Sequence, residues 1–390
     1  MHAIICGAGI AGLALANRLS ALGQDVTVLE RSPGPRPQGY MIDFFGPGYD
    51  AMCAMGLLPA MQEVAYHVEE AVLVDEDGRR QAGINILQFA EGDVLSMMRP
   101  DLEQVLREHL PGDVNLRYGA TLTGVTPRSD GLRVELADGS TLDGELLIGA
   151  DGIHSAVRRL VFGPESTYLR FLGFHTAAYS FDAPEIHAEV GGRFCLTDTM
   201  GSQFGFYALR DGRVASFAVH RTADPVTPAD TREAIRSAYG DLGWVVPRAL
   251  ELCPDDDQIY YDQVAQIVMP RWSSGRVALV GDACGAVSLL AGQGASLGVA
   301  GAFLLAEKLV SSSSIEDGLA EYERVWRPVV EEKQKVARST ARWFLPQSRF
   351  ELVARRVLLR FLRLPVLRKL LPAALAGKPT TLIRDLQPTH

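Results

Sequence analysis

Residues 2–30 read HAIICGAGIAGLALANRLSALGQDVTVLE, and this stretch decides how the first part of the chain folds. Residues 3–6 form an uninterrupted apolar run, which is typical of a strand buried in a parallel sheet. A G-x-G-x-x-G spacing follows, and the apolar residues after it recur with the period of a helix. A second apolar strand then ends at Glu30. Strand, glycines, helix, strand and acid in this order predict a βαβ unit.

Each of these positions suits a bound dinucleotide. Gly7 permits a tight turn, Gly9 lets the backbone approach a pyrophosphate, and Gly12 lets helix and strand pack closely. The N-terminus of the helix presents its partial positive charge to the anion. Glu30 follows Gly12 by 18 positions (30 − 12), where a carboxylate accepts ribose hydroxyls and repels a 2′-phosphate. The sequence therefore predicts FAD or NAD here and disfavours NADP; the alternative is a glycine-rich turn without a ligand.

Length and composition limit the class of protein. A chain of 390 residues has room for two or three domains and a large core. The net charge of −9 argues against nucleic-acid binding, which needs clustered Lys and Arg. No apolar run approaches the ~20 residues of a membrane span, and the start of the chain lacks the basic region of a secretion signal. Five cysteines without a C-x-x-C pair favour a reduced, cytoplasmic protein with neither disulfides nor a zinc site.

The order of patterns suggests that the first domain is interrupted. Residues 71–86 read as a hairpin, and residues 167–269 alternate between apolar and polar positions, as in an antiparallel sheet with one helix at 231–239. A parallel-type strand returns at residue 276. We therefore expect an α/β fold with C-terminal helices. It comprises a Rossmann-like domain with a parallel sheet (1–70, 94–166 and 270–345), an inserted, mostly antiparallel substrate-binding sheet (71–93 and 167–269) and a basic helical tail (346–390).

A second motif lies in residues 146–158. A strand delivers Asp151 to its carboxyl end, Gly152 permits a turn, and Ser155 can cap a helix that carries Arg158. Taken alone, this motif is better explained as an ordinary strand-to-helix turn.

A third motif lies in residues 277–296. Its strand ends at Asp282, where a carboxylate can accept sugar-like hydroxyls, and glycines lead into another helix. The N-terminus of that helix suits an anionic ligand atom, such as one on a reduced flavin ring.

Together the three motifs resemble the single-component FAD-dependent aromatic monooxygenases, the p-hydroxybenzoate hydroxylase-like family. The resemblance covers residues 2 to about 342, and the loop into residues 39–43 looks most like the short tetracycline-inactivating members. It implies that FAD is held by Gly7, Gly9, Ala11, Gly12, Glu30, Arg31, Asp43, Arg99, Asp151, Asp282, Gly292, Gly294 and Ala295.

The resemblance also implies a reaction. An FAD-dependent monooxygenase would use NAD(P)H, with NADPH preferred, and O2 to hydroxylate an aromatic or polyketide-like small molecule through a flavin C4a-hydroperoxide. NAD(P)H would bind transiently, because the sequence shows no second dinucleotide fold. The chain differs from the family where Gly285 and Leu289 replace a usual His and Pro, and where Ser296 and Gly301 replace Asn and Asp. A flavin-dependent dehydrogenase or reductase, and a non-catalytic FAD-bound protein that sequesters a small molecule, remain as alternatives.

The inserted sheet would supply the substrate pocket, although no catalytic residue is assigned. Candidates that orient a substrate, handle protons or line an apolar cavity are His175, Phe194, Phe204, Phe206, Tyr207, Arg210, Phe217 and His220. For each of them taken alone, a structural role is the better explanation. The basic and apolar segment 350–371 would pack against both domains or make weak contact with an anionic membrane surface. A monomer and a homodimer are both compatible with the sequence.

Overall fold

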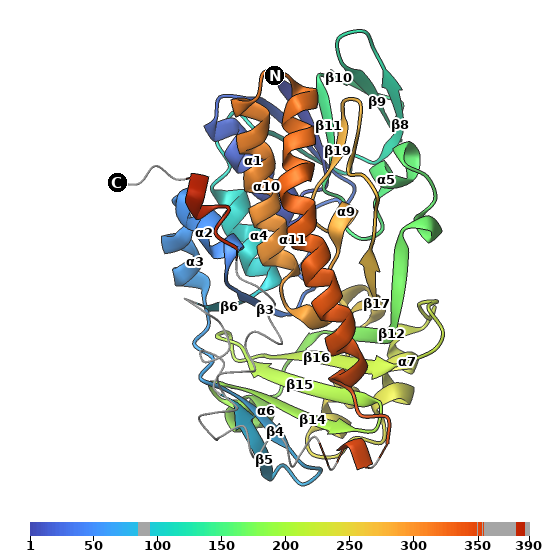
Figure 1. Cartoon of the computed structure of the whole chain (residues 1–390). Helices are drawn as coiled ribbons and strands as arrows, with labels where there is room; N and C mark the ends of the chain where they lie inside the picture. Colours follow the sequence, from blue (N-terminus) through green and yellow to red (C-terminus); the bar gives the residue numbers. More distant parts are fainter. Residues whose placement is uncertain (85–93, 349, 353, 355–379, 387–390) are drawn as a thin grey trace.

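Two β-sheets organise the computed structural model, which describes residues 1–84, 94–348, 350–352, 354 and 380–386 (Figure 1). The first has six strands in the order β18 (Ser273–Ser274), β19 (Val277–Leu279), β11 (Leu146–Gly149), β1 (His2–Cys6), β2 (Asp25–Glu30) and β7 (Asn115–Tyr118). The second runs β17 (Tyr260–Ile267), β12 (Leu169–Ala178), β16 (Val214–Arg221), β15 (Ser202–Ala208), β14 (Arg193–Thr199), β4 (Glu70–Val74) and β5 (Arg80–Ile84), with β13 (Ser180–Phe181) paired to β16.

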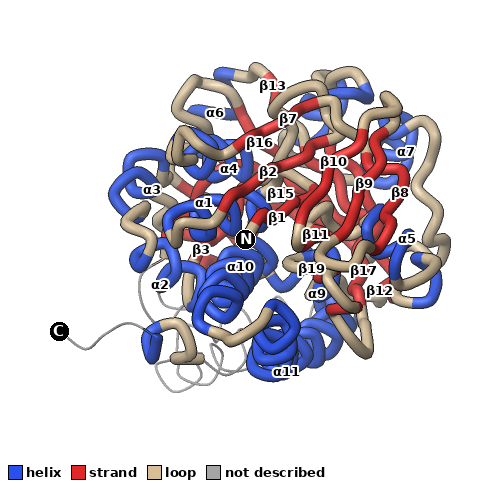
Figure 2. The backbone as a smooth tube through the Cα atoms, turned by 90° about the horizontal axis from the view of Figure 1, so that it is seen from above, coloured by secondary structure: helices blue, strands red, loops and turns tan. Residues whose placement is uncertain are grey.

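The first sheet confirms the predicted βαβ unit. Strand β1 pairs in parallel with β2 and β11, and Ile4 lies opposite Thr27 and Leu147. Figure 2 shows α1 (Ile10–Ala21) and α10 (Gly294–Ser311) side by side next to β1. A small sheet of β8 (Leu122–Pro127), β9 (Leu132–Leu136) and β10 (Thr141–Gly144) contributes to the same core. Ile4 and Ile5 are fully buried as a result, which is why this strand is continuously apolar.

The second sheet is mostly antiparallel, and short helices cover one of its faces. These helices are α6 (Pro184–Val190), α7 (Thr231–Tyr239) and α8 (Val246–Glu251). The expectation of one helix in this region was wrong, although α7 has the predicted bounds. Helices α6 and α8 have only 7 and 6 residues, and each carries a proline in its first turn. Proline favours both a turn and the first turn of a helix, so the sequence pattern does not separate the two.

The two sheets are joined by short elements and one long helix. A two-stranded sheet of β3 (Met41–Phe44) and β6 (Leu95–Met98) leads into α4 (Arg99–Glu108), and α2 (Pro47–Ala54) and α3 (Leu58–Val64) lie nearby. Helix α5 (Ala156–Val161) follows β11, and the one-turn α9 (Asp282–Gly285) follows β19. Helix α11 (Ile315–Phe344) runs from the first sheet to the second (Figure 1).

The predicted tail lies mostly outside the described residues, including all of 355–379. Where the chain is described again, Ile383 is fully buried and Arg384 Nε donates to Asp50 Oδ2 at 2.9 Å. All five cysteines fall in the described part and are free. Within that part, α10 is long and apolar enough to cross a membrane, but 67% of it is buried inside the molecule, as in a core helix.

Candidate active site

The three glycines of the first motif have different neighbours. Gly7 has a φ of +109°, and a Cβ there would lie 2.5 Å from the Ala150 carbonyl oxygen. A Cβ at Gly12 would lie 1.9 Å from the Gly7 carbonyl oxygen, so the packing of the protein itself requires both glycines. A Cβ at Gly9 would meet nothing closer than Glu103 Oε1 at 3.7 Å among the described residues. The absence of a side chain at Gly9 therefore leaves open space beside the backbone, as a pyrophosphate would need.

The start of α1 also suits an anion. No side chain of the described residues caps this helix after Gly9, so the first N–H groups are available to a ligand. Glu30 is 8% exposed; its Oε2 accepts a hydrogen bond from Ala8 N at 2.9 Å and its Oε1 accepts one from Ser32 N at 2.9 Å. A carboxylate oxygen has a second lone pair, so Glu30 can still accept a ribose hydroxyl. The Arg31 side chain is exposed.

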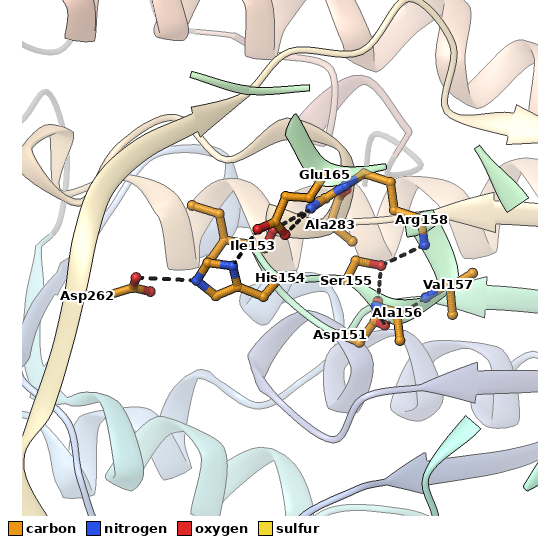
Figure 3. A network of polar contacts seen from close by, with 10 residues as sticks. All are labelled: Asp151, Ile153, His154, Ser155, Ala156, Val157, Arg158, Glu165, Asp262 and Ala283. Carbon is orange, nitrogen blue, oxygen red and sulfur yellow. Dashed lines mark hydrogen bonds and ion pairs between the residues drawn. The ribbon is translucent and has the colours of Figure 1, made fainter. Parts of the chain in front are cut away.

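The second motif forms a helix cap (Figure 3). Ser155 Oγ accepts from Arg158 N at 2.9 Å, which confirms the predicted cap. The Asp151 carboxylate accepts from Ser155 Oγ at 2.5 Å and from the backbone N–H groups of Ala156 and Val157 at 2.7 and 3.1 Å. These bonds give Asp151 the structural role that the sequence left open. Binding of FAD by Asp151 remains a prediction.

Arg158 ties the second motif to the third. Its guanidinium is fully buried and donates to the carbonyl oxygens of Ala283 at 2.9 Å and Ile153 at 2.6 Å (Figure 3). It also pairs with Glu165 at 2.8 Å. Because this side chain is fully buried and bonded to both motifs, Arg158 fixes the distance between them.

His154 connects the second motif to the antiparallel sheet. Its Nδ1 lies 3.0 Å from Glu165 Oε1, and its Nε2 lies 3.3 Å from Asp262 Oδ1 on β17 (Figure 3). The hydrogen bond to Asp262, followed by the nearby charges, raises the pKa of His154 to about 9 although burial opposes the shift. A protonated imidazole donates from both nitrogens, so His154 bridges the two sheets as a cation.

The third motif packs against the first. Gly281 has a φ of +64°, and a Cβ there would lie 2.9 Å from the Ala11 side chain. The three motifs, far apart in the sequence, therefore meet at the carboxyl ends of β1, β11 and β19. Asp282 is exposed to solvent, yet burial raises the pKa of its carboxyl and Arg99 lowers it. We infer from these two observations that the Asp282 carboxylate faces a hollow that is open to solvent but has protein on most of its sides.

Arg99 lies within electrostatic reach of Asp282 and forms a close pair with Glu103. Arg99 Nη2 lies 2.6 Å from Glu103 Oε1, and the two side chains are 22% and 8% exposed. The contact is close but not aligned as a hydrogen bond, and Glu103 Oε1 has no aligned donor among the described residues. The open space at Gly9, the uncapped helix and the charged pair all fit a dinucleotide.

An aromatic wall, formed by Tyr40, Phe217 and Tyr260, lies where the loop before β3 meets the second sheet. The ring of Tyr40 lies 5.9 Å from the ring of Phe217 and 5.2 Å from that of Tyr260. Burial raises the pKa of Tyr40, Arg99 lowers it and Asp282 raises it, which places the wall within electrostatic reach of both charged groups. Sequence analysis missed Tyr40 and Tyr260. Only the alternation of β17, in which Tyr260 and Asp262 share one face, could have indicated Tyr260.

Two pocket candidates lie on the opposite face of the second sheet from Phe217. Phe206 is fully buried and packs on Phe204 at 5.0 Å and Trp244 at 5.5 Å under the short helices. His220 Nδ1 lies 3.0 Å from the hydroxyl of Tyr239 on α7. Both therefore belong to the helix-covered face, because alternate residues of a strand point to opposite faces.

The other candidates have structural partners or remain predictions. Arg210 donates to the carbonyl oxygens of Glu63 at 3.2 Å and Ala65 at 3.1 Å and lies over the ring of Tyr66, so it holds the end of α3. Asp43 accepts from Ser96 Oγ at 2.6 Å, and burial raises the pKa of its carboxyl. Phe217 belongs to the aromatic wall.

The remaining pocket candidates divide between the two faces. Phe194 and Tyr207 stack at 4.2 Å near β3, His175 Nδ1 lies 3.1 Å from the Tyr261 hydroxyl, and Phe204 is part of the core under the helices. Gly292 precedes α10, whose first residues are Gly294 and Ala295, and a Cβ at Gly294 would lie 3.8 Å from Asp282 Oδ1.

Comparison with known proteins identifies the family. The FAD binding domain family matches residues 1–337. An uncharacterized protein of Mycobacterium tuberculosis is 36% identical over 350 residues, covering 85% of this chain and 91% of its own. A flavin-dependent monooxygenase from an unknown prokaryotic organism is 30% identical over 350 residues, covering 85% and 87%. The crystal structure of tetracycline destructase Tet(51) superposes with a TM-score of 0.81 at 25% identity, covering 97% of this chain and 99% of that chain. This chain therefore belongs to the FAD binding domain family of flavin-dependent monooxygenases.

Proposed function

We propose that this protein uses NAD(P)H, with NADPH preferred, and O2 to hydroxylate an aromatic or polyketide-like small molecule. The observation that supports this most directly is the wall of Tyr40, Phe217 and Tyr260, which lies within electrostatic reach of Arg99 and Asp282. When bound, FAD supplies the redox chemistry of the reaction, which includes accepting a hydride and activating oxygen.

The residues of this chain would hold the cofactor along its length. Gly9 and the start of α1 suit the pyrophosphate, and Glu30 suits the adenosine ribose. Asp282, which faces the hollow, would accept hydroxyls of the ribityl chain, and Arg99 would balance the charge of the phosphates. The turn at residues 292–295 would lie against the flavin ring.

The aromatic wall would orient the substrate. Flat side chains offset from one another favour stacking with another aromatic ring, and they exclude water from the reacting carbon. Burial raises the pKa of both Tyr40 and Tyr260, so their hydroxyls stay protonated at neutral pH. Protonated phenols donate hydrogen bonds, which suits a substrate that carries carbonyl or phenolic oxygens.

We further propose that the protein is cytoplasmic and is a monomer or homodimer. Its five free cysteines and its net charge of −9 support a reducing compartment and a small-molecule partner rather than nucleic acid.

The direct test incubates the purified, yellow protein with NADPH, 18O2 and candidate phenols. We expect substrate to accelerate flavin reduction and the product to gain one 18O atom. Accelerated reduction with hydrogens gained or lost but no 18O incorporated would instead establish the dehydrogenase or reductase alternative. Tight binding of the phenol without any change in its mass would establish the sequestering alternative.

A further inference from the structure

The loop after the Gly-Asp motif is held in an uncommon conformation. Residues 286–293 contain no proline and a single glycine, so the sequence of the loop restrains its path little. Ser288 nevertheless has a φ of +106° and is 5% exposed, and its Oγ accepts from Leu290 N at 3.2 Å. Residues with side chains rarely adopt such a φ and keep it only where the surrounding structure enforces it.

Two buried glutamines contact this loop from different elements. Gln266 lies on β17 and is 0% exposed, and Gln334 lies on α11 and is 3% exposed. Gln266 Nε2 donates to the Val287 carbonyl oxygen at 2.8 Å, and Gln334 Nε2 donates to the Ala286 carbonyl oxygen at 3.0 Å. The two carbonyls that precede the strained serine are thus bound by side chains from both sides.

Each amide also binds the backbone of the element that carries the other. Gln266 Nε2 donates to the backbone carbonyl oxygen of Gln334 at 3.0 Å, and Gln334 Nε2 donates to the backbone carbonyl oxygen of Ile267 at 2.8 Å. Arg338 Nη1 donates to Gln266 Oε1 at 2.8 Å. Because a primary amide has two donor hydrogens, each glutamine uses one on the loop and one on the element opposite. The carboxamides therefore have one orientation that satisfies every partner.

The path of this loop sets the position of the residues after it. Leu290 packs in the same apolar cluster as Phe217 of the aromatic wall. Two residues later Gly292 turns with a φ of +63°, and Gly294 comes to lie beside Asp282. A shift of residues 286–288 would therefore move two groups together. These are the backbone of Gly292 and Gly294 beside Asp282, on the cofactor side, and the Leu290 side chain near Phe217, on the substrate side.

We infer that Gln266 and Gln334 are positioning residues that lock residues 286–288, and thereby fix the backbone of 290–294 between Asp282 and Phe217. The expected effect on catalysis, that less oxygen is released as hydrogen peroxide, rests on the proposed function. The expected effect on the backbone of residues 290–294 does not depend on it.

The test uses the full chain loaded with FAD and the variants Gln266→Met and Gln334→Met, which keep side-chain length but remove the donors. We expect amide hydrogen exchange of residues 286–294 to accelerate roughly tenfold in each single variant, because opening of the loop then breaks one buried hydrogen bond fewer. We also expect a changed flavin fluorescence and a several-fold larger share of NADPH oxidation ending in hydrogen peroxide. Hydrogen exchange of residues 286–294 in the double variant should be only slightly faster than in the single variant with the larger effect, since both amides act on one loop.

Tyr179→Phe provides the matched control. It removes a buried hydroxyl that donates to the Ala249 carbonyl oxygen at 2.9 Å, in the apolar cluster under the short helices and not in the one that contains Leu290. This variant should lose thermal stability while the exchange of 286–294 and the flavin signal stay unchanged.

Glutamine variants that behave like this control would overturn the inference and leave only a structural role. Should both fail to fold, Gln266→Glu decides the question, because it keeps an acceptor for Arg338 while it removes the donor to the Val287 carbonyl oxygen; unchanged loop exchange would again overturn the inference. A wild-type protein that forms no oxygenated product would contradict the proposed function alone, since loop exchange and flavin fluorescence are measured without turnover.

Discussion

The parallel sheet and the antiparallel sheet contribute to the candidate site in different ways. The parallel sheet contributes mainly backbone: Gly7, Gly9 and Gly12 and the helix end beside them leave room for a ligand. The antiparallel sheet contributes side chains from one face, such as Phe217 and Tyr260. A site made of backbone needs glycine at fixed spacings, whereas a site made of a sheet face needs only some bulky residues at alternate positions. The first therefore leaves a much clearer signal in sequence than the second.

The largest effect that probes this comparison is expected at the glycines. Gly12→Ala places a methyl group 1.9 Å from the Gly7 carbonyl oxygen, so it should cost more than about 4 kcal/mol and abolish both folding and FAD binding. Gly9→Ala meets no atom closer than 3.7 Å, so it should keep the melting temperature of the FAD-free protein and weaken FAD binding about 100-fold. Thermal melting and flavin titration measure the two effects.

Gly34→Ala is the control for the glycine series. A Cβ there meets nothing within 4 Å among the described residues, so both properties should stay unchanged. If Gly9→Ala retained normal FAD affinity, the backbone at Gly9 would not approach the pyrophosphate.

The next largest effect separates the two faces of the antiparallel sheet. Phe206→Ala should destabilise the protein by about 3–5 kcal/mol, because it empties a core position under the helices, and should leave KM for the substrate near normal. Phe217→Ala should destabilise less and raise KM several-fold, because it opens the wall beside Tyr40. Urea unfolding and steady-state kinetics measure the two quantities. An unchanged KM in Phe217→Ala, or a raised KM in Phe206→Ala, would reverse our assignment of the faces.

A smaller effect is expected at Asp282. Asp282→Ala removes a carboxylate that faces the hollow, and hydrogen bonds to charged groups contribute about 1.5–3 kcal/mol, so FAD affinity should fall roughly 10- to 100-fold. Burial raises the pKa of this carboxyl, which means that the charge is unfavourable in the empty protein. The variant should therefore melt no lower than wild type without FAD. An unchanged FAD content after purification would show that Asp282 does not bind the cofactor.

The smallest effect concerns pH and the helix-covered face. Burial, followed by the nearby His175, lowers the pKa of His220 from 6.5 to about 4. The unfolded chain therefore takes up a proton that the folded protein does not, and His220 reduces stability as pH falls from about 6.5 to about 4. The partial exposure of the ring limits this loss to about 1–2 kcal/mol. His220→Gln should remove that part of the pH dependence in urea unfolding at pH 7 and 4.5 and leave turnover unchanged. Identical pH slopes in variant and wild type would contradict the assignment.

The same contrast explains how much could be predicted from the sequence. The spacing of Gly7, Gly9 and Gly12 before Glu30 predicted the βαβ unit, because those positions follow from backbone sterics alone. Alternation identified strands around Phe206 and Phe217 but not which face is covered by helices, since that depends on segments far away in the sequence. Tyr40 was missed for a related reason. Its place beside Phe217 and Tyr260 exists only once a loop of the first domain meets the second sheet.

Helix α11 limits how the molecule can admit a ligand. Its 30 residues span roughly 45 Å at 1.5 Å per residue. Its early turns pack Tyr322 and Trp326 into the main core, and its last turns pack Ala341 against the antiparallel sheet. Pro328 lies between these two contacts and removes a backbone hydrogen bond of the helix, so relative motion of the two halves should bend the helix at that point. Entry of a large ligand would then depend on this bend or on movements of short connecting segments.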